Sequence, residues 1–285
     1  MKSSAVSFLI STQNPDGGWG YAPQQSSAVE PTSAVLLALR EDPSCAESCR
    51  RAIDWLRSAQ HLDGGWGFSS RDDESAWHTA WAVVALARSG ETGNVLNRGV
   101  KWLLEVKTVQ FGEDAMQAGK KISTVDLSLR GWPWLNGEAT WIEPTALALL
   151  ALESIPGIAA ADRINEALRY IQDRRCPGGG WNVGNPVMFT SALPALVHTT
   201  AWVLLALFKS APETILPEDI KILRSEMHRD GGILGLAWGL LALKTFGTNE
   251  TLAVGRLAAL QGKDGGWANN PYKTAAALMA IKGYL

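Results

Sequence analysis

Two glutamates occupy the same place in a short repeated pattern, Glu-Pro-Thr, at residues 30–32 and again at residues 143–145. A carboxyl group that is buried away from water holds its proton more tightly, whereas the positive end of a helix favours its charged form. A suitably placed carboxyl group can donate a proton to a substrate. Proline and an acidic side chain are also favoured in the first turn of a helix, which is the structural alternative. Glu143 and Glu30 are therefore the candidate catalytic residues.

Aromatic side chains and one histidine recur where other apolar segments begin. The faces of indole and phenol rings carry partial negative charge, so they can stabilise a carbocation. The same side chains can also simply pack a core, and the sequence leaves both roles open. The candidate substrate-binding residues are Trp77, Trp81, Trp141, His198, Trp202, Trp238 and Tyr272.

Residues that could bind a metal or a diphosphate are few and poorly spaced. Cys176 lies three residues after Asp173, at the turn before the fourth inner segment, and His198 lies at the start of that segment. A second donor set, Glu30, Glu143 and His198, would converge only in a narrow cavity. Five basic residues could meet a diphosphate, although a solvated rim predicts the same charges: Arg71, Lys120, Lys121, Arg130 and Lys273. We predict no metal site and no cofactor.

An internal repeat positions these residues. Gly-Gly-Trp turns lie at Asp16–Gly20, Asp63–Gly67, Gly179–Trp181 and Asp264–Trp267, with a degenerate copy at Arg130–Trp134 and a copy without tryptophan at Asp230–Ile233. Repetition at intervals of this length is typical of architectures built from stacked or ring-forming units.

Two kinds of helix alternate around the turns. Segment 51–59 has apolar residues near i, i+3, i+4 and i+7 with charges between them, which predicts an amphipathic outer helix. After each turn comes a segment that is apolar almost all round and must be covered on every side. These six inner segments are Ser33–Leu39, Ala80–Leu86, Ala146–Leu152, Ala201–Leu207, Ala237–Leu243 and Ala275–Ile281.

Six inner and six outer helices predict a closed ring. An open solenoid would carry polar capping repeats, whereas the last apolar segment runs to Leu285 and needs a covering neighbour. We therefore expect an all-α, (α/α)6 toroid formed by one domain, residues 1–285. Alignment of the inner segments gives one recurring threonine position, Thr32, Thr79, Thr145, Thr200 and Thr274. Two residues earlier lie Glu30, Trp77, Glu143, His198, Leu234 and Tyr272, which we expect around one mouth of the ring.

Composition limits the partners. Hydrophobic residues make up 46% of the chain, and a net charge of −2 gives no electrostatic reason to bind nucleic acid. The three cysteines, Cys45, Cys49 and Cys176, suit reduced thiols in the cytoplasm. Phe8–Ile10 is too short for a secretion signal, and no apolar run is long enough to span a membrane.

Two insertions interrupt the repeat. Residues 107–128 are polar and can form a surface lid or a plain loop. Residues 183–197 are apolar and lie beside the expected mouth, where they can wall a lipid cavity, touch a membrane surface or pack the core. We expect a cytoplasmic protein that can contact a membrane peripherally.

The turns carry a family resemblance. Segment 52–66, with Gln60 and the Gly-Gly-Trp turn, resembles the QW motif of squalene and oxidosqualene cyclases, as do 5–19 with Gln13, 167–181 with a displaced Gln172, and 257–267 with Gln261. The chain thus resembles the prenyltransferase and squalene-cyclase repeat superfamily, which includes triterpene cyclases, class II diterpene cyclases and protein prenyltransferase β subunits. The resemblance implies an (α/α)6 barrel and a structural role for the motif.

The resemblance also implies a chemistry. Class II cyclases protonate an alkene or epoxide with the middle aspartate of a D-x-D-D-T-A motif, and here residues 141–146 read Trp-Ile-Glu-Pro-Thr-Ala. Glu143 falls on the middle acid, while Trp141 and Pro144 replace the two other aspartates. The leading prediction is a terpene-cyclase-like protein that starts cyclisation of a polyprenyl substrate in a hydrophobic barrel cavity by proton donation from Glu143.

Two other functions remain open. One is a non-catalytic toroid that binds an isoprenoid, another lipid or a protein partner. The other is a prenyltransferase-like enzyme. Triterpene cyclases use two such barrels, so the resemblance implies a partner domain or a homodimer that completes the pocket.

Overall fold

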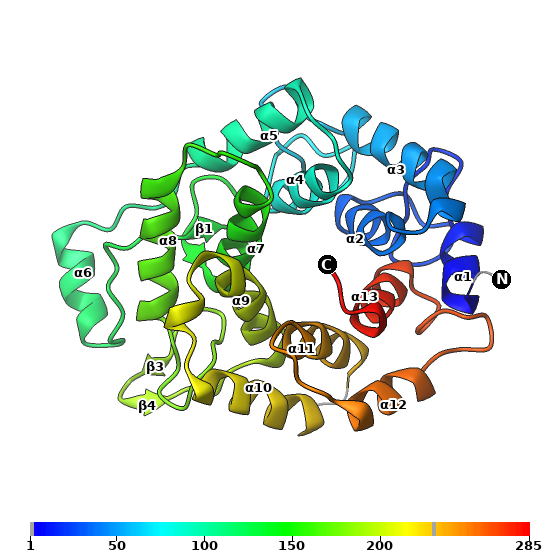
Figure 1. Cartoon of the computed structure of the whole chain (residues 1–285). Helices are drawn as coiled ribbons and strands as arrows, with labels where there is room; N and C mark the ends of the chain where they lie inside the picture. The colour runs from blue at the N-terminus through cyan, green and yellow to red at the C-terminus, as the bar shows by residue number, and fades with distance from the viewer. Residues whose placement is uncertain (1–2, 230–231) are drawn as a thin grey trace.

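The computed structural model describes residues 3–229 and 232–285, which form two concentric layers of helices (Figure 1). The inner helices are α2 (Val29–Leu39), α4 (His78–Arg88), α7 (Ile142–Glu153), α9 (Val197–Ser210), α11 (Ile233–Thr245) and α13 (Pro271–Lys282). The outer helices are α1 (Ser4–Ser11), α3 (Ala46–Ser58), α5 (Asn94–Glu105), α8 (Ala161–Asp173), α10 (Pro217–Arg229) and α12 (Thr251–Ala259). The predicted division into apolar inner and amphipathic outer helices is confirmed.

The inner layer closes on itself. Each inner helix packs against the next in chain order, and α13 packs against both α11 and α2, as the end-on view shows (Figure 1). The last turn also reaches the first helix, because the Gln261 side chain donates to Ser4 Oγ at 3.1 Å. The fold is therefore the predicted α/α toroid.

The recurring threonine fastens each turn to the inner helix that follows it. Its hydroxyl oxygen accepts a hydrogen bond from the backbone N–H of the turn tryptophan at 2.8–3.0 Å in five repeats. The pairs are Thr32 with Trp19, Thr79 with Trp66, Thr145 with Trp132, Thr200 with Trp181 and Thr274 with Trp267. Because these tryptophans are buried, the hydroxyl satisfies a donor that water cannot reach.

The turn tryptophan and glutamine tie the outer layer together. The Trp66 indole N–H donates to the Leu56 carbonyl at 2.7 Å, and the other four turn tryptophans make the equivalent bond. Gln60 donates both to its own turn, at Gly64 O, and to Val95 O in the next outer helix, at 2.8 Å each. The motif residues thus join one repeat to the next, which is the structural role that the resemblance implied.

Glycine is required at one point of the turn. Gly64 has a φ of 96°, and a Cβ there would lie 2.8 Å from the Arg98 carbonyl oxygen on the next outer helix. The left-handed backbone and the close approach both exclude a larger residue. The same combination recurs at Gly17, whose Cβ would lie 2.5 Å from the Arg51 carbonyl oxygen.

Smaller elements fill the connections. The degenerate third turn forms the antiparallel pair β1 (Trp132–Pro133) and β2 (Thr140–Trp141), and two 3-10 turns, η1 (Pro43–Cys45) and η2 (Pro212–Thr214), precede outer helices. Insertion 107–128 contains a further helix, α6 (Glu113–Lys120), which lies outside α8 (Figure 1). Insertion 183–197 contains the hairpin β3 (Val187–Met188) and β4 (Ser191–Ala192). The expected turn at Asp230–Ile233 lies partly outside the described residues.

Candidate functional site

Both candidate acids lie in first turns of inner helices at the same mouth of the ring. Glu30 is in the first turn of α2 and Glu143 in that of α7, each followed by proline. Neither helix has a side-chain hydrogen bond at its N-cap, so no capping side chain offsets the partial positive charge of the helix end. The two carboxyl groups are close enough for the charge of Glu143 to raise the pKa of Glu30.

The Glu30 carboxyl group lies beside two tyrosine hydroxyl groups. The Tyr21 hydroxyl donates a short hydrogen bond to Glu30 Oε2. Burial raises the pKa of Glu30 above its ordinary value, and hydrogen bonds from Tyr21 and Tyr272 offset this only in part. Burial and the neighbouring Glu30 charge raise the pKa of both tyrosines, so both stay hydroxyl donors. The environment therefore favours a protonated Glu30 that can still be stabilised after losing its proton.

Glu143 has a different set of partners. The Thr199 hydroxyl donates to Glu143 Oε1 at 2.7 Å, and His198 Nδ1 lies 3.6 Å from the same oxygen. The Trp202 indole N–H donates to His198 Nε2 at 2.8 Å, so this nitrogen accepts and the neutral ring carries its proton on Nδ1. Burial lowers the pKa of His198, and the charge of Glu143 opposes this shift only in part. The lowered pKa favours the neutral ring. His198 thus presents a proton towards Glu143.

Four aromatic rings from four inner helices close the lumen below these acids. Trp202 and Trp238 have ring centroids 4.4 Å apart, and Trp81 lies 5.2 Å from Trp202 in an edge-to-face contact. Tyr272 completes the set at 6.0 Å from Trp81 and 6.2 Å from Trp238. We call these four residues the aromatic floor. All are at most 5% exposed, so side chains fill the lumen at this level.

The groups above the aromatic floor remain accessible. The His198 side chain is 38% exposed and that of Glu143 is 19% exposed, although both lie deep enough to contact buried partners. Phe68 is 48% exposed; its ring stacks on Tyr21 at 5.9 Å and meets His78 edge-on at 5.8 Å. A ligand in the mouth would therefore lie on the floor and against these side chains.

Two of the predicted substrate-binding residues lie elsewhere. Trp77 packs against His78 and against Trp134, with ring centroids 4.6 and 4.8 Å apart. Trp141 is the N-cap of α7 and lines a cavity of about 140 Å³ together with residues of insertion 107–128. The structure therefore brings together Glu30, Glu143, His198 and the aromatic floor, but places Trp77 and Trp141 at its edge.

Sequence reasoning did not identify Tyr21, Thr199 or Phe68. Thr199 directly precedes the recurring Thr200, so its place in the first turn of α9 was available from the repeat. Tyr21 and Phe68 belong to loops that follow the first two turns, and no pattern in the sequence shows that these loops fold over the mouth. Contacts between separate repeats decide their position.

One serine, histidine and aspartate set is structural. His61 Nδ1 lies 2.9 Å from Ser75 Oγ, but the Ser75 hydroxyl donates to Asp63 at 2.7 Å. The serine proton therefore points away from the histidine, which is the reverse of a nucleophilic triad. In the first turn Asn14 donates to the equivalent Ser27, which donates to Asp16. The histidine thus replaces an asparagine as a turn-stabilising donor.

Metal ligands do not gather in the described part of the chain. No group of three or more histidine, cysteine, aspartate or glutamate side chains there could hold a metal ion. Asp173 pairs with Arg174, while Cys176 is buried in the fourth turn, where burial raises the pKa of its thiol. Neither residue approaches His198 closely enough for a hydrogen bond or ion pair in residues 3–229 and 232–285.

The comparisons agree with this architecture. Residues 1–119 match the family model described as the squalene-hopene cyclase C-terminal domain. No curated relative matches the chain. The match and the shared fold confirm the resemblance to the squalene-cyclase-like repeat superfamily.

Solved structures with this fold have more than one activity. The apo type II terpene cyclase MstE from Scytonema is 17% identical, with a TM-score of 0.65 over 98% of this chain and 95% of that chain. A variant of MstE in complex with geranylgeranyl dihydroxybenzoate, its substrate, matches with the same identity and TM-score over 98% and 94%. An α-amylase from Clostridium perfringens is 11% identical, with a TM-score of 0.62 over 99% and 97%. Identities this low establish a common fold, and the activity must be argued from the site.

Proposed function

We propose that the mouth of the ring binds an isoprenoid-bearing small molecule and starts its cyclisation by donating a proton to it. The observation that carries the proposal is the Glu30 carboxyl group, buried beside the aromatic floor and hydrogen-bonded by Tyr21. The family match to a cyclase domain and the isoprenoid substrate of MstE support the choice of substrate class.

Glu30 is the better proton donor of the two acids. Burial raises the pKa of Glu30 and the nearby charge of Glu143 contributes to that shift, so Glu30 keeps its proton to a higher pH than an ordinary glutamate. After transfer, the Glu30 carboxylate keeps the hydrogen bonds from Tyr21 and Tyr272. We therefore assign the acid role to Glu30 and a supporting electrostatic role to Glu143, whereas the family motif alone favoured Glu143.

The acid strength of Glu30 limits which chemical group of the substrate it can protonate. A carboxyl group with a raised pKa is a weaker acid than a free glutamate, and an alkene carbon is a poorer proton acceptor than an oxygen lone pair. An epoxide terminus fits best, because protonation of its oxygen and cleavage of one C–O bond give a hydroxyl group and a carbocation. Chain alkenes close rings onto that cation, aromatic faces stabilise it, and loss of a proton from the final cation ends the reaction.

The test compares acids and substrates directly. The purified protein and the Glu30→Gln, Glu143→Gln and Tyr21→Phe variants are incubated with epoxide-terminated and plain polyprenyl substrates, and the products are identified by mass spectrometry. We expect a cyclic product from the epoxide that is absent in Glu30→Gln and reduced in Tyr21→Phe. A product that survives Glu30→Gln and disappears in Glu143→Gln would reassign the acid to Glu143.

A non-catalytic binding protein is the second candidate, and one observation favours it. The aromatic floor excludes solvent from the lumen, which leaves less room for a long folded chain than an open barrel would. Isoprenoid binding without any product from the parent protein would support this second function.

We further propose that the mouth contacts a membrane surface. Phe189, at the tip of the β3–β4 hairpin, is 68% exposed, and Leu196 beside the same insertion is 45% exposed. No helix in the described residues is long and apolar enough to cross a bilayer, so such contact would be peripheral. Co-sedimentation with lipid vesicles should decrease in Phe189→Ser. Equal sedimentation of the parent and variant proteins would contradict the assignment of this hairpin.

Completion of the pocket by a second copy or a partner domain stays a prediction. Its readout is the mass of the purified protein in solution by light scattering.

A further inference from the structure

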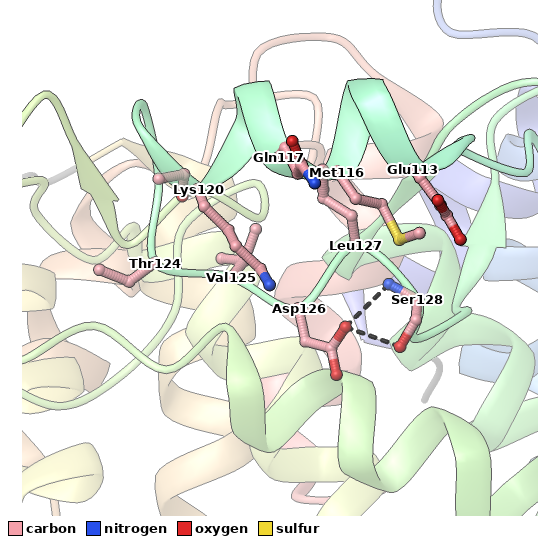
Figure 2. Close-up of a pocket in the computed structure, with 10 residues that line it drawn as sticks. Glu113, Met116, Gln117, Lys120, Thr124, Val125, Asp126, Leu127 and Ser128 are labelled. Atoms are coloured by element: carbon pink, nitrogen blue, oxygen red, sulfur yellow. Dashed lines mark hydrogen bonds between the residues drawn. The ribbon is translucent and has the colours of Figure 1, made fainter.

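A second cavity lies outside the ring, under helix α6. It has a volume of about 720 Å³, opens to solvent, and is bounded by α6 on one side and residues 123–128 on the other (Figure 2). We call it the α6 cleft. It is formed by insertion 107–128, which interrupts the repeat and is not needed to close the ring.

Helix α6 presents one face to the cleft and does not pack into the core. The residues that line it are Glu113, Met116, Gln117 and Lys120, at spacings of i, i+3, i+4 and i+7. No residue of α6 is buried. Three of these four side chains are polar or charged, so this face suits contact with a polar group of a ligand.

The cleft also offers a polar atom in need of a partner. The Ser123 Oγ atom is shielded from solvent and has no hydrogen-bond partner in residues 3–229 and 232–285. A hidden hydroxyl without a partner is unfavourable, and a ligand hydroxyl or carbonyl in the cleft would satisfy it. Ser123 and Gln117 line the cavity together with the apolar Met116 and Leu127.

The cleft adjoins the smaller cavity beside the N-cap of α7. Val125 and Leu127 line both the α6 cleft and the smaller cavity of about 140 Å³. Trp141 lines that smaller cavity and is followed two residues later by Glu143. The two cavities therefore share a wall, and the smaller one reaches Trp141, the N-cap of α7.

The charges around the cleft argue against a diphosphate. Glu113 and Asp126 are acidic and only Lys120 is basic among the lining residues. Hydrogen bonds from Ser128 hold the pKa of Asp126 below its ordinary value, and the charge of Lys120 contributes. Lys120 thus faces a carboxylate, and Figure 2 shows its side chain directed towards Asp126.

The basic side chains of the smaller, adjoining cavity are also already paired. Its two arginines already have partners: Arg130 Nε donates to Glu166 at 2.8 Å, and Arg174 pairs with Asp173.

From these observations we propose that the α6 cleft binds the uncharged, hydroxyl-bearing end of an amphiphilic isoprenoid whose hydrocarbon chain runs past Trp141 to the mouth. The inference rests on the proposed function, because it places the polar end of the same substrate. It makes insertion 107–128 the part of the chain that selects substrates by their head group.

Calorimetric titration with three probes tests the assignment. Geranylgeranyl hydroquinone carries a neutral phenol head, geranylgeranyl diphosphate a charged head, and squalene no head. Met116→Trp fills the cleft, whereas Ala115→Trp places the same bulk on the opposite face of α6 and is the matched control. Circular dichroism checks that both variants keep the helical content of the parent.

We expect Met116→Trp to weaken hydroquinone binding by about tenfold, the equivalent of losing ~1.4 kcal/mol of contacts. Ala115→Trp should leave it unchanged, squalene binding should be the same in both variants, and the diphosphate should bind more weakly than the hydroquinone. Equal hydroquinone affinity in Met116→Trp and the parent, or tighter binding of the diphosphate, would refute the cleft assignment. Such a result would leave the proposed function intact if the parent still forms a cyclic product. Failure of the parent to bind any probe would refute both.

Discussion

The threonine that follows each turn should contribute measurably to stability, and α2 allows a matched test. Thr32 and Ser33 are neighbours, and both are fully buried. Thr32 Oγ1 accepts from the Trp19 N–H at 2.9 Å and faces the Trp19 carbonyl at 3.3 Å. The Ser33 hydroxyl has no hydrogen-bond partner within the described part of the chain. Replacement by an apolar residue of similar shape should therefore destabilise the protein at Thr32 but not at Ser33.

The size of the effect follows from the group left behind. Thr32→Val keeps the side-chain shape but leaves the Trp19 N–H buried without an acceptor, since Trp19 is 0% exposed. An unsatisfied buried donor costs about 1–3 kcal/mol. Ser33→Ala removes a hydroxyl that already lacks a partner, so its effect on the free energy of unfolding should be near zero or stabilising.

Urea unfolding followed by far-ultraviolet circular dichroism measures both changes. For a chain of this size about 1 kcal/mol corresponds to roughly 2–4 °C in Tm, so Thr32→Val should lower the thermal midpoint by several degrees. Thr32→Ser keeps the acceptor and should recover most of the loss. A Thr32→Val protein as stable as Ser33→Ala would refute the view that this hydroxyl fastens the turn to the inner helix.

Three further predictions concern the mouth and the turns. Because burial raises the pKa of Glu30, the folded state binds its proton more tightly than the unfolded state, and this contribution to stability is lost as the pH rises through the raised value. Glu30→Gln should therefore stabilise the protein more in alkaline than in mildly acidic buffer, by thermal unfolding, whereas the exposed Glu138→Gln should show no such trend. His61→Asn should retain the parent Tm, because the first turn has asparagine at the equivalent position. His61→Leu removes one hydrogen bond and should lower the free energy of unfolding by about 1 kcal/mol. Gly64→Ala should destabilise by about 1–3 kcal/mol more than Gly90→Ala, since both have positive φ but only Gly64 would meet a backbone oxygen; equal losses would contradict the contact argument.

The candidate site was only partly predictable. Glu30 and Glu143 were located at the mouth because the repeat fixes their phase on α2 and α7. Both read Glu-Pro-Thr, and the resemblance to the family motif favoured Glu143 as the acid. The Tyr21 hydroxyl, supplied by a loop, distinguishes Glu30, while Thr199 and His198 distinguish Glu143. Such partners come from other repeats, whose side-chain directions a sequence pattern does not specify.

Insertion 107–128 was likewise only partly predictable from the sequence. The polar character of residues 107–128 predicted a surface segment, but neither its helix α6 nor the cleft beneath it was foreseen. Placement of Trp141 against the smaller cavity of about 140 Å³, away from the aromatic floor, also came only from the structure. An isolated short helix is marginal by itself, and its position depends on what it packs against.

The sequence alone determined the architecture. Turns and apolar helices repeat six times along the chain, and few arrangements bury the apolar surface of all these helices. It also placed Glu30, Glu143 and His198 at one mouth, because position in a repeat becomes position on a ring. Only the tertiary structure decided which acid lies beside tyrosine hydroxyl groups and that four rings close the lumen. Burial, hydrogen bonding and charge act over a few ångströms between residues far apart in the chain, and the folded backbone sets those distances.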